Sequence, residues 1–449
     1  MLTTLEESMK KLKLSLLIVL SAVSFSFAQN LLQAGPLVGY STMREVCLWV
    51  QTTKEAKVKF SYWNVNDKEK KFFTNEVATK ADEGFTAKII CGNLDEGQTY
   101  NYELFINDKK VARPYELKFQ TQKLWQWRSD PPNFSLVFGS CNYVNEPKYD
   151  RPGKPYGANH EIFKSILEKK PDLMIWLGDN FYYREGDWDS WSGILHRNTH
   201  TRSLPELQPL WGSVHHYAIW DDHDFGPNDS DRGFWNKERT FEAFKLFWPN
   251  PSFGINGKPG ITTYFQWSDV EFFLLDDRYY KTPNDRSDEE KVILGENQFN
   301  WLIDNLSYSR APFKVVAVGG QFLNSNTGTE NFSRAPKERE QILRALEENK
   351  IEGVIFIDGD IHRSEISKLA RENSYPIYDF TISPFTAGPS KISDNPFRIE
   401  NTVYADRNFA RFEITGARKN RVLKCTLFDV NGKEIWNYSI NENELKYKK

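Results

Sequence analysis

Apolar and polar residues alternate in short runs along the N-terminal part of the chain. The clearest run is 56–62 (Ala-Lys-Val-Lys-Phe-Ser-Tyr), and similar runs occur at 46–50 and 85–90. Alternation at a period of two predicts strands, and several short strands between turn residues predict a β-sandwich. Residues 29–124 are therefore expected to form an all-β module. Trp125, Trp127 and a Pro-Pro pair indicate a linker after it.

From residue 133 onward, apolar strands alternate with amphipathic helices. Strands are expected at 134–138, 172–177, 217–220, 270–275, 313–318 and 354–357, and helices at 160–170, 296–306 and 337–349. Repeated strand–helix–strand units predict a largely parallel sheet covered by helices. Near the end of the chain, strands at 411–414 and 422–427 are followed by Asn431-Gly432, a strong hairpin turn.

Composition limits the class of protein. The chain has 449 residues, of which 27% are charged, and its formal net charge is −3. This length favours two domains, which we place at 29–124 and 133–445. No basic excess exists, so general nucleic-acid binding is not expected. The sequence gives no indication of an oligomeric state.

The N-terminus predicts export. Residues 9–13 are cationic, 14–23 are apolar, and the small residues Ser26 and Ala28 precede a plausible cleavage point at Gln29. This arrangement is typical of a signal peptide at 1–28, with an apolar run too short for a stable membrane span. The mature protein is expected to be periplasmic or secreted. In that compartment, Cys47 and Cys91 are either a disulfide or two buried thiols.

Chemically active residues follow the predicted strands. The strand ends carry Gly139-Ser140-Cys141, Gly178-Asp179-Asn180-Phe181-Tyr182-Tyr183, Trp220-Asp221-Asp222-His223 with Asn228, Asp276-Asp277-Arg278, and Gly359-Asp360-Ile361-His362. The carboxyl ends of parallel strands meet at one edge of a sheet, where ligands bind. Carboxylates gathered there would repel one another unless a cation neutralised them. The sequence therefore predicts a metal centre, and Asp179 is the best bridging residue.

The chemistry of these side chains narrows the choice of metal. Taken singly, each has an ordinary structural explanation: Cys141 as a small buried residue, the Gly-Asp pairs as turns. Taken together, thiolate, phenolate, carboxylate, amide and imidazole groups suit a trivalent or redox-capable metal beside a harder divalent ion.

The motif series resembles that of the PhoD-like alkaline phosphatases, within the calcineurin-like metallophosphoesterases. The resemblance covers about 133–445, and residues 29–124 resemble the family's fibronectin-III-like N-terminal module. It implies an α/β fold of two packed β-sheets flanked by helices, with an iron(III) (Fe³⁺) and calcium (Ca²⁺) centre. The residues that resemble the iron ligands are Cys141, Asp179, Tyr182 and His362, with Tyr183 as an alternative to Tyr182. Those that resemble the calcium ligands are Asp179, Asn228 and Asp360, and Asp222 matches a metal-ligand position of the wider superfamily.

The resemblance also implies an activity. We expect hydrolysis of a small phosphate ester by a metal-bound hydroxide that attacks phosphorus. Arg278 and His223 resemble groups that bind or protonate the phosphate. Monoesters, diesters and phospholipid head groups are not distinguished.

Two other classes of function stay open. In the first, Cys141 is a nucleophile activated by His223, as in a metal-free thiol hydrolase. In the second, the chain is an exported binding or adhesion protein with a structural metal. Metal removal compared with thiol alkylation distinguishes the first, and a filled centre without turnover would indicate the second.

Overall fold

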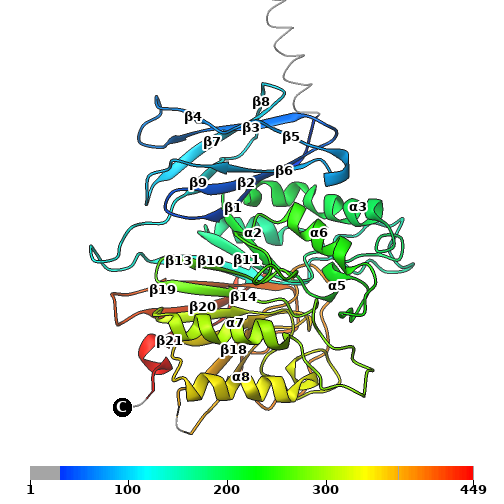
Figure 1. Ribbon diagram of the computed structural model, residues 1–449, viewed down its shortest axis with the longest axis vertical. Coiled ribbons are helices and arrows are strands. Elements are labelled where there is room, and N and C mark those ends of the chain that lie inside the picture. The colour runs from blue at the N-terminus through cyan, green and yellow to red at the C-terminus, as the bar shows by residue number, and fades with distance from the viewer. Residues whose placement is uncertain (1–30, 373, 448–449) are drawn as a thin grey trace, which may run out of the picture.

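The computed structural model describes residues 31–372 and 374–447 of the chain. The signal peptide expected at 1–28 lies outside these residues. Within the described part, the strands form three sheets, and the largest of them extends along the long axis of the molecule (Figure 1).

The N-terminal module consists mainly of strands. These are β1 (Leu32–Ser41), β2 (Val46–Thr52), β3 (Lys57–Asn64), β4 (Phe72–Phe73), β5 (Val77–Ala78), β6 (Thr86–Cys91), β7 (Thr99–Ile106), β8 (Lys109–Val111) and β9 (Lys118–Gln120). Strands β3, β4, β5, β7, β8 and β9 form one antiparallel sheet. Strands β1, β2 and β6 face it but belong to a nine-stranded sheet that continues into the rest of the chain.

The body of the molecule contains two sheets. The nine-stranded sheet has the order β21-β20-β19-β10-β11-β12-β1-β2-β6 and adds β10 (Phe134–Gly139), β11 (Leu173–Leu177), β12 (His215–Ile219), β19 (Asn408–Thr415), β20 (Val422–Asp429) and β21 (Glu434–Asn441). The second, six-stranded sheet has the order β13-β14-β15-β16-β18-β17. It contains β13 (Thr263–Trp267), β14 (Val270–Leu274), β15 (Phe313–Ala317), β16 (Val354–Asp358), β17 (Glu365–Leu369) and β18 (Ile377–Thr381).

Helices cover the body sheets. They are α2 (Ile162–Glu168), α3 (Trp191–Arg202), α4 (Gln208–Trp211), α5 (Asp222–Phe225), α6 (Lys237–Phe247), α7 (Gly295–Tyr308) and α8 (Pro336–Glu348). Helices α7 and α8 lie in front of the six-stranded body sheet in Figure 1, and they bury Leu302, Leu306, Ile342 and Leu346. Helices α3 and α6 lie between the N-terminal module and α5 in Figure 1.

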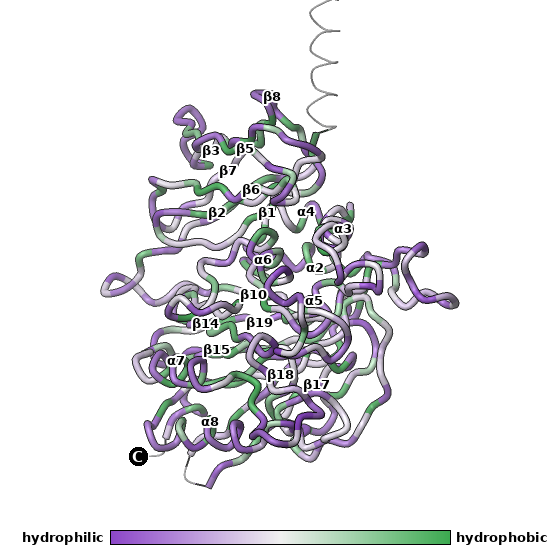
Figure 2. Tube along the Cα trace, turned by 45° about the vertical axis from the view of Figure 1, so that its right-hand side comes forward, coloured by the Kyte–Doolittle hydropathy of each residue, from purple (hydrophilic) through white to green (hydrophobic). Residues whose placement is uncertain are grey.

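One apolar core lies between the two body sheets. Strands β11 and β16 are buried over their full length. Continuous apolar runs, rather than alternation, are typical of strands that are covered on both faces. Figure 2 shows this distribution, with hydrophobic segments along the strands and hydrophilic residues on the projecting loops. The expected fold class is confirmed: two packed β-sheets flanked by helices, preceded by an all-β module.

Strands β1 and β2 join the N-terminal module to the body. Val38 and Leu48 contribute to the core of the module, whereas Leu37 and Trp49 contribute to the core of the body. Neighbouring residues on a strand point to opposite faces, so each strand serves both cores. In addition, Trp49 Nε1 donates a hydrogen bond to the carbonyl oxygen of Leu246 at 2.9 Å, and β1 pairs in parallel with β12. The two expected units therefore share one sheet.

His215 of β12 lies at this junction. Its Nδ1 lies 2.7 Å from the carbonyl oxygen of Gly39, and its Nε2 accepts a hydrogen bond from the backbone N–H of Gln120 at 3.1 Å. Since Nε2 accepts, the proton of the neutral ring belongs on Nδ1. Protonation of Nε2 would set two N–H groups against each other. Burial lowers the pKa of His215 to about 4.

This histidine should make the junction sensitive to acid. An unfolded histidine binds its proton near pH 6.5, whereas folded His215 does not bind one until about pH 4. Between these values the unfolded state holds more protons, so the free energy of unfolding falls as the pH falls from 6.5 to 4. We expect His215 to contribute roughly 3 kcal/mol of this loss. In His215→Gln, which keeps a donor and an acceptor, urea unfolding at pH 7 and pH 4 should show a correspondingly smaller loss. Parallel pH profiles for both proteins would contradict this role.

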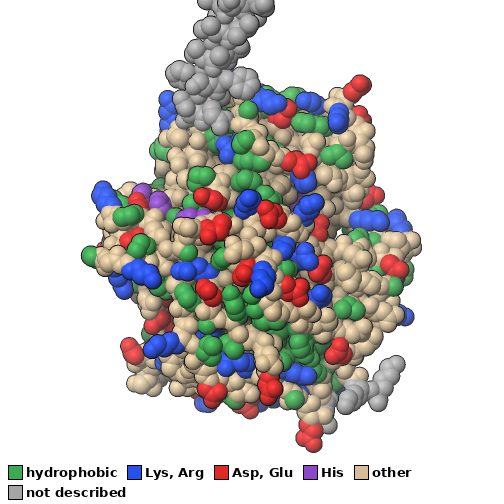
Figure 3. Space-filling view, turned by 180° about the vertical axis from the view of Figure 1, so that it is seen from behind, with side chains coloured by type: hydrophobic (Ala, Val, Ile, Leu, Met, Phe, Trp, Pro, Cys, Tyr) green, Lys and Arg blue, Asp and Glu red, His purple; other side chains and the backbone are tan. Residues whose placement is uncertain are grey.

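None of the helices among the described residues is long and apolar enough to cross a membrane. On the face seen in Figure 3, basic and acidic side chains are interspersed. Cys47 and Cys91 are both buried and unbonded, which corresponds to the two-thiol alternative.

Candidate metal centre

Four strand ends bring the expected ligands together. Strand β10 leads to Cys141, β11 to Asp179 and Tyr182, β12 to Asp222 and His223, and β16 to Asp360 and His362. Strands β10, β11 and β12 are parallel neighbours, so their carboxyl ends share one edge. The end of β16 supplies ligand atoms to the same groups from the other body sheet.

Cys141, Asp179 and His362 form the first cluster. Each offers one ligand atom, and these atoms all lie within 4.8 Å of one another. Cys141 Sγ lies 3.5 Å from Oδ2 of Asp179, and the Tyr182 hydroxyl lies 3.0 Å from Nε2 of His362. The four side chains that resemble iron ligands in the sequence are therefore adjacent.

Of the two tyrosines in the second motif, Tyr182 is the one beside His362. The Tyr183 hydroxyl instead accepts a hydrogen bond from Asn198 Nδ2 at 3.1 Å, and its ring packs 5.0 Å from that of Phe181. This geometry favours Tyr182 over the alternative that the sequence left open.

Asp222 connects the first cluster to a second one. It belongs to one group with Asp179 and to another with Asp221 and Asp360, and in each group the ligand atoms lie within 4.8 Å of one another. Asn228 is exposed and lines the same cavity of about 430 Å³ as Asp179, Asp222 and Asp360. All of the expected calcium ligands therefore border one cavity.

The acidic groups of the site oppose one another's ionisation. Burial raises the pKa of Asp179 well above its usual range, and the nearby Asp222 carboxylate raises it further. Burial, followed by the Asp222 carboxylate, also raises the pKa of Asp360 well above its usual range. Burial, followed by Asp179, raises the pKa of the Cys141 thiol. A bound cation would reverse these shifts because it favours every negatively charged form.

The donor atoms fit a pair of cations. Asp221 Oδ2 and Asp222 Oδ1 are buried and have no hydrogen-bond partner in the described part of the chain. A buried polar atom without a partner costs about 1–3 kcal/mol. Asp221 and Asp222 also belong to one candidate metal-binding group, so their free oxygens fit a cation site. The thiol, phenol and imidazole groups suit a softer or trivalent ion, and the carboxylates beside them suit a divalent one.

A second layer of residues fixes the first cluster. His362 Nδ1 lies 2.6 Å from the carbonyl oxygen of Gly388, so a proton on Nδ1 leaves the Nε2 lone pair facing the cluster. The Tyr156 hydroxyl also lies 2.9 Å from Nδ1. Ser383 Oγ donates to Cys141 Sγ at 3.1 Å and accepts from the backbone N–H of His362 at 3.1 Å. Ser383 thus connects two of the candidate ligands.

Asp224 holds the loop that carries Asp179. Its carboxylate accepts hydrogen bonds from the backbone N–H groups of Asp179 at 2.7 Å, Asn180 at 2.8 Å and Asp221 at 2.8 Å. These bonds join the ends of β11 and β12. They also support the left-handed backbone of Asp179, whose φ is 49°.

His223 lies on the wall of the cavity. Its ring centroid is 4.1 Å from that of Tyr182, and its backbone N–H donates to Asp179 Oδ1 at 3.3 Å. Burial lowers the pKa of His223, although the carboxylate of Asp222, 3.9 Å from its Nε2, opposes this shift.

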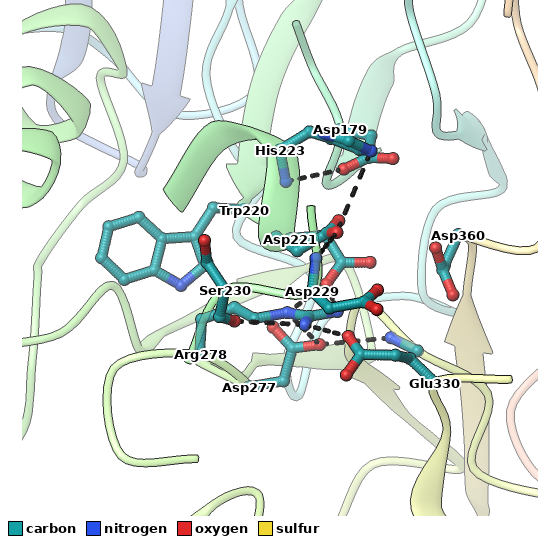
Figure 4. A network of polar contacts seen from close by, with 12 residues as sticks. Asp179, Trp220, Asp221, His223, Asp229, Ser230, Asp277, Arg278, Glu330 and Asp360 are labelled. Atoms are coloured by element: carbon teal, nitrogen blue, oxygen red, sulfur yellow. Dashed lines mark hydrogen bonds and ion pairs between the residues drawn. The ribbon is translucent and has the colours of Figure 1, made fainter. Parts of the chain in front are cut away.

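Arg278 is buried and lies outside the lining of the cavity. Its side chain is 2% exposed. Figure 4 shows its guanidinium among the carboxylates of Asp221, Asp277 and Glu330, and it forms ion pairs with all three. The contact of Arg278 with a phosphate, expected from the sequence, stays a prediction. The guanidinium of Arg278 pairs with Asp221 and thereby supports one carboxylate of the acidic cluster.

Sequence reasoning did not assign several residues of the site. Asp221 was visible in its motif, but the family resemblance assigned a ligand position only to its neighbour Asp222. Glu330, which forms a candidate group with Asp222 and Asp229, lies in a loop without a recognisable motif. Tyr156 is likewise in an irregular segment far from the strand ends.

Most of the body of the chain matches one protein family. A model described as PhoD-like phosphatase matches residues 136–416, which is more than half of the chain and includes every proposed ligand. The chain belongs to the PhoD-like phosphatase family. A second model, described as a domain of unknown function (DUF7800), matches residues 29–124.

Individual relatives agree with the PhoD-like assignment. Alkaline phosphatase D of Bacillus subtilis (strain 168) is 24% identical over 287 residues, which are 53% of this chain and 47% of the relative. The match thus spans about half the length of that protein. A solved structure of PhoD aligns with a TM-score of 0.75 at 17% identity and covers 94% of this chain and 92% of its own. Purple acid phosphatase PPD1 from yellow lupin (Lupinus luteus) seeds aligns with a TM-score of 0.62 at 12% identity and covers 90% and 74%. Both structures share the fold.

Proposed function

We propose that this PhoD-like protein is an exported, metal-dependent hydrolase of small phosphate esters. The observation that carries the proposal is the convergence of Cys141, Asp179 and His362 within 4.8 Å, beside a cavity, in a chain of a phosphatase family. Phosphate monoesters and diesters are both within its scope. The signal-like segment at 1–28 supports export to the periplasm or the medium.

The metals of the proposal are iron(III) and calcium. Side chains of Cys141, Asp179, Tyr182 and His362 would hold the iron, and those of Asp179, Asp222, Asn228 and Asp360 would hold the calcium. The softness of the first donor set and the hardness of the second support this division. When bound, the two ions supply Lewis acidity and neutralise charge on phosphoryl oxygens.

The chain's own residues orient the ester and handle its proton. His223 lines the cavity, and we assign it the role of hydrogen-bonding the leaving-group oxygen and giving it a proton. The proton comes from the protonated ring, which returns to its neutral form; burial lowers the pKa of His223 and so makes the protonated ring a stronger acid. Asp224 and Ser383 keep the ligand loops in place before the substrate binds.

The thiol-hydrolase alternative is poorly supported. A nucleophilic cysteine needs an accessible thiol with a lowered pKa. Cys141 is 0% exposed, and burial raises the pKa of its thiol. The position of Cys141 beside Asp179 and His362 instead fits a metal ligand, because a bound cation would favour its thiolate form.

Metal analysis combined with activity tests the proposal. Protein purified without chelator should contain iron and calcium in proportion to protein. It should hydrolyse chromogenic phosphate mono- or diesters, lose this activity on chelation and recover it when calcium is restored. Full activity after exhaustive metal removal would contradict the proposal, and a filled centre without turnover would favour the binding-protein alternative.

The two tyrosines provide a matched control for iron. A ferric phenolate absorbs visible light, so Tyr182→Phe should lose this band. Tyr183→Phe, which removes a hydroxyl bonded to Asn198, should keep it.

A further inference from the structure

Two cationic side chains line the wall of the metal-site cavity. Arg334 and Lys391 border the same cavity as Asp179 and Asp360. Arg334 ends a short helical turn and donates from Nε to the Thr329 carbonyl at 3.4 Å. Neither Arg334 nor Lys391 forms an ion pair with any residue that the structure describes, although carboxylates are abundant in this cavity.

The segment that carries Lys391 is firmly held beside His362. The backbone N–H of Ser390 donates to the carbonyl oxygen of His362 at 2.9 Å. Arg363, which is 2% exposed, donates to Ser393 Oγ at 2.7 Å and to the Lys391 carbonyl at 3.4 Å. A buried arginine therefore fixes the loop, while the Lys391 side chain is left exposed at the cavity.

The cavity is larger than one phosphate group requires. Its volume of about 430 Å³ lies in the range of clefts that enclose a whole small molecule. Metals would neutralise the carboxylates at one part of its lining. Arg334 and Lys391 would then be uncompensated charges in the same lining, which also includes Thr329 and Ser390. Arginine and lysine are ordinary partners of a phosphate.

We infer that Arg334 and Lys391 bind a second phosphate group of the substrate, so that the protein prefers small molecules bearing two phosphates over those bearing one. This inference rests on the proposed phosphoester hydrolase function and names the substrate class of the same site. The second phosphate supplies binding energy at a distance from the reacting phosphorus, and it therefore acts mainly on affinity.

Inhibition of the metal-loaded, full-length protein tests this inference. Glucose 6-phosphate and glucose 1,6-bisphosphate are compared as competitors of a chromogenic phosphate ester. Two phosphates on one molecule give a statistical factor of about two. We expect the bisphosphate to inhibit at least about 10-fold more tightly, which corresponds to one charge-assisted contact. In the double variant Arg334→Met, Lys391→Met, the ratio of inhibition constants should fall to about two, the statistical value.

A second double variant controls for overall charge. Lys164→Met, Arg344→Met removes an exposed lysine from α2 and an exposed arginine from α8, and it should keep the wild-type ratio. A wild-type ratio near two, or an unchanged ratio in the Arg334/Lys391 variant, would overturn the inference while hydrolysis of the chromogenic ester still supported the proposed function. Failure to hydrolyse any ester would instead overturn the proposed function and this inference with it.

Discussion

Asp179→Asn is expected to lose both metals and to lower kcat/KM by on the order of 10³-fold. Asp179 belongs to two of the candidate ligand groups, one with Cys141 and His362 and one with Asp222 and His223. Asparagine adopts the left-handed backbone required at φ 49° and can still accept the hydrogen bond from the His223 N–H. The substitution therefore removes a charge with little change of shape. Metal content and steady-state kinetics of the purified variant provide the measurement.

A surface substitution separates this effect from a general loss of charge. Asp304→Asn, on the exposed side of α7, should retain metals and activity. Asp179→Asn with normal metal content would show that Asp179 is not shared between the two ions.

Arg278→Ala is expected to lower the free energy of unfolding by about 3–5 kcal/mol. This loss of stability, and not a change in a step of the reaction, is its main expected effect. The guanidinium is buried among Asp221, Asp277 and Glu330, and its removal leaves these carboxylates without their shared counter-ion. Lys281 still pairs with Glu330, but it does not form an ion pair with Asp221. Urea unfolding of the variant, compared with Arg344→Ala on the surface of α8, measures the loss.

The outcome distinguishes two roles of this arginine. A residue that contacts the phosphate directly would lower kcat/KM and leave the free energy of unfolding nearly unchanged. A strong fall in stability, accompanied by weaker metal binding, would fit a guanidinium that supports the acidic cluster.

Much of the fold follows from the periodicity of the sequence. The strand expected at 56–62 is β3, and the helices expected at 296–306 and 337–349 are α7 and α8, each within two residues. Residues 160–170 form a shorter helix, α2, because Lys170 adopts a left-handed φ of 49° before Pro171. These elements have clear local signals, since their apolar positions repeat at the period of the structure that they form.

The joining of the N-terminal module to the body had no local signal. Strand β2 (Val-Cys-Leu-Trp-Val-Gln-Thr) is buried throughout, and this pattern shows that both faces are covered without indicating by what. Pairing of β1 with β12 depends on contacts between distant parts of the chain. The boundary inferred from Trp125 and Trp127 therefore marks where alternating strands give way to strands and helices. It carries no information about the sheet that both parts share.

The site was predictable to the extent that its residues follow strands. Cys141, Asp179 and His362 follow predicted strands, so the topology alone brings them together. The surroundings of Arg278 were not predictable in this way. They include Glu330, which lies in a loop whose course the sequence does not specify. An arginine at a strand end can face a ligand or a buried acid, and only tertiary structure distinguishes these two environments.

The pairing of β1 with β12 has a consequence for shortened forms of this protein. If residues 31–124 were removed, β12 would become an open sheet edge, with unpaired backbone groups able to hydrogen-bond to another molecule. Leu37 and Trp49 would also leave a gap in the apolar interior of the remaining part. A truncated body should therefore self-associate instead of behaving as a smaller independent enzyme.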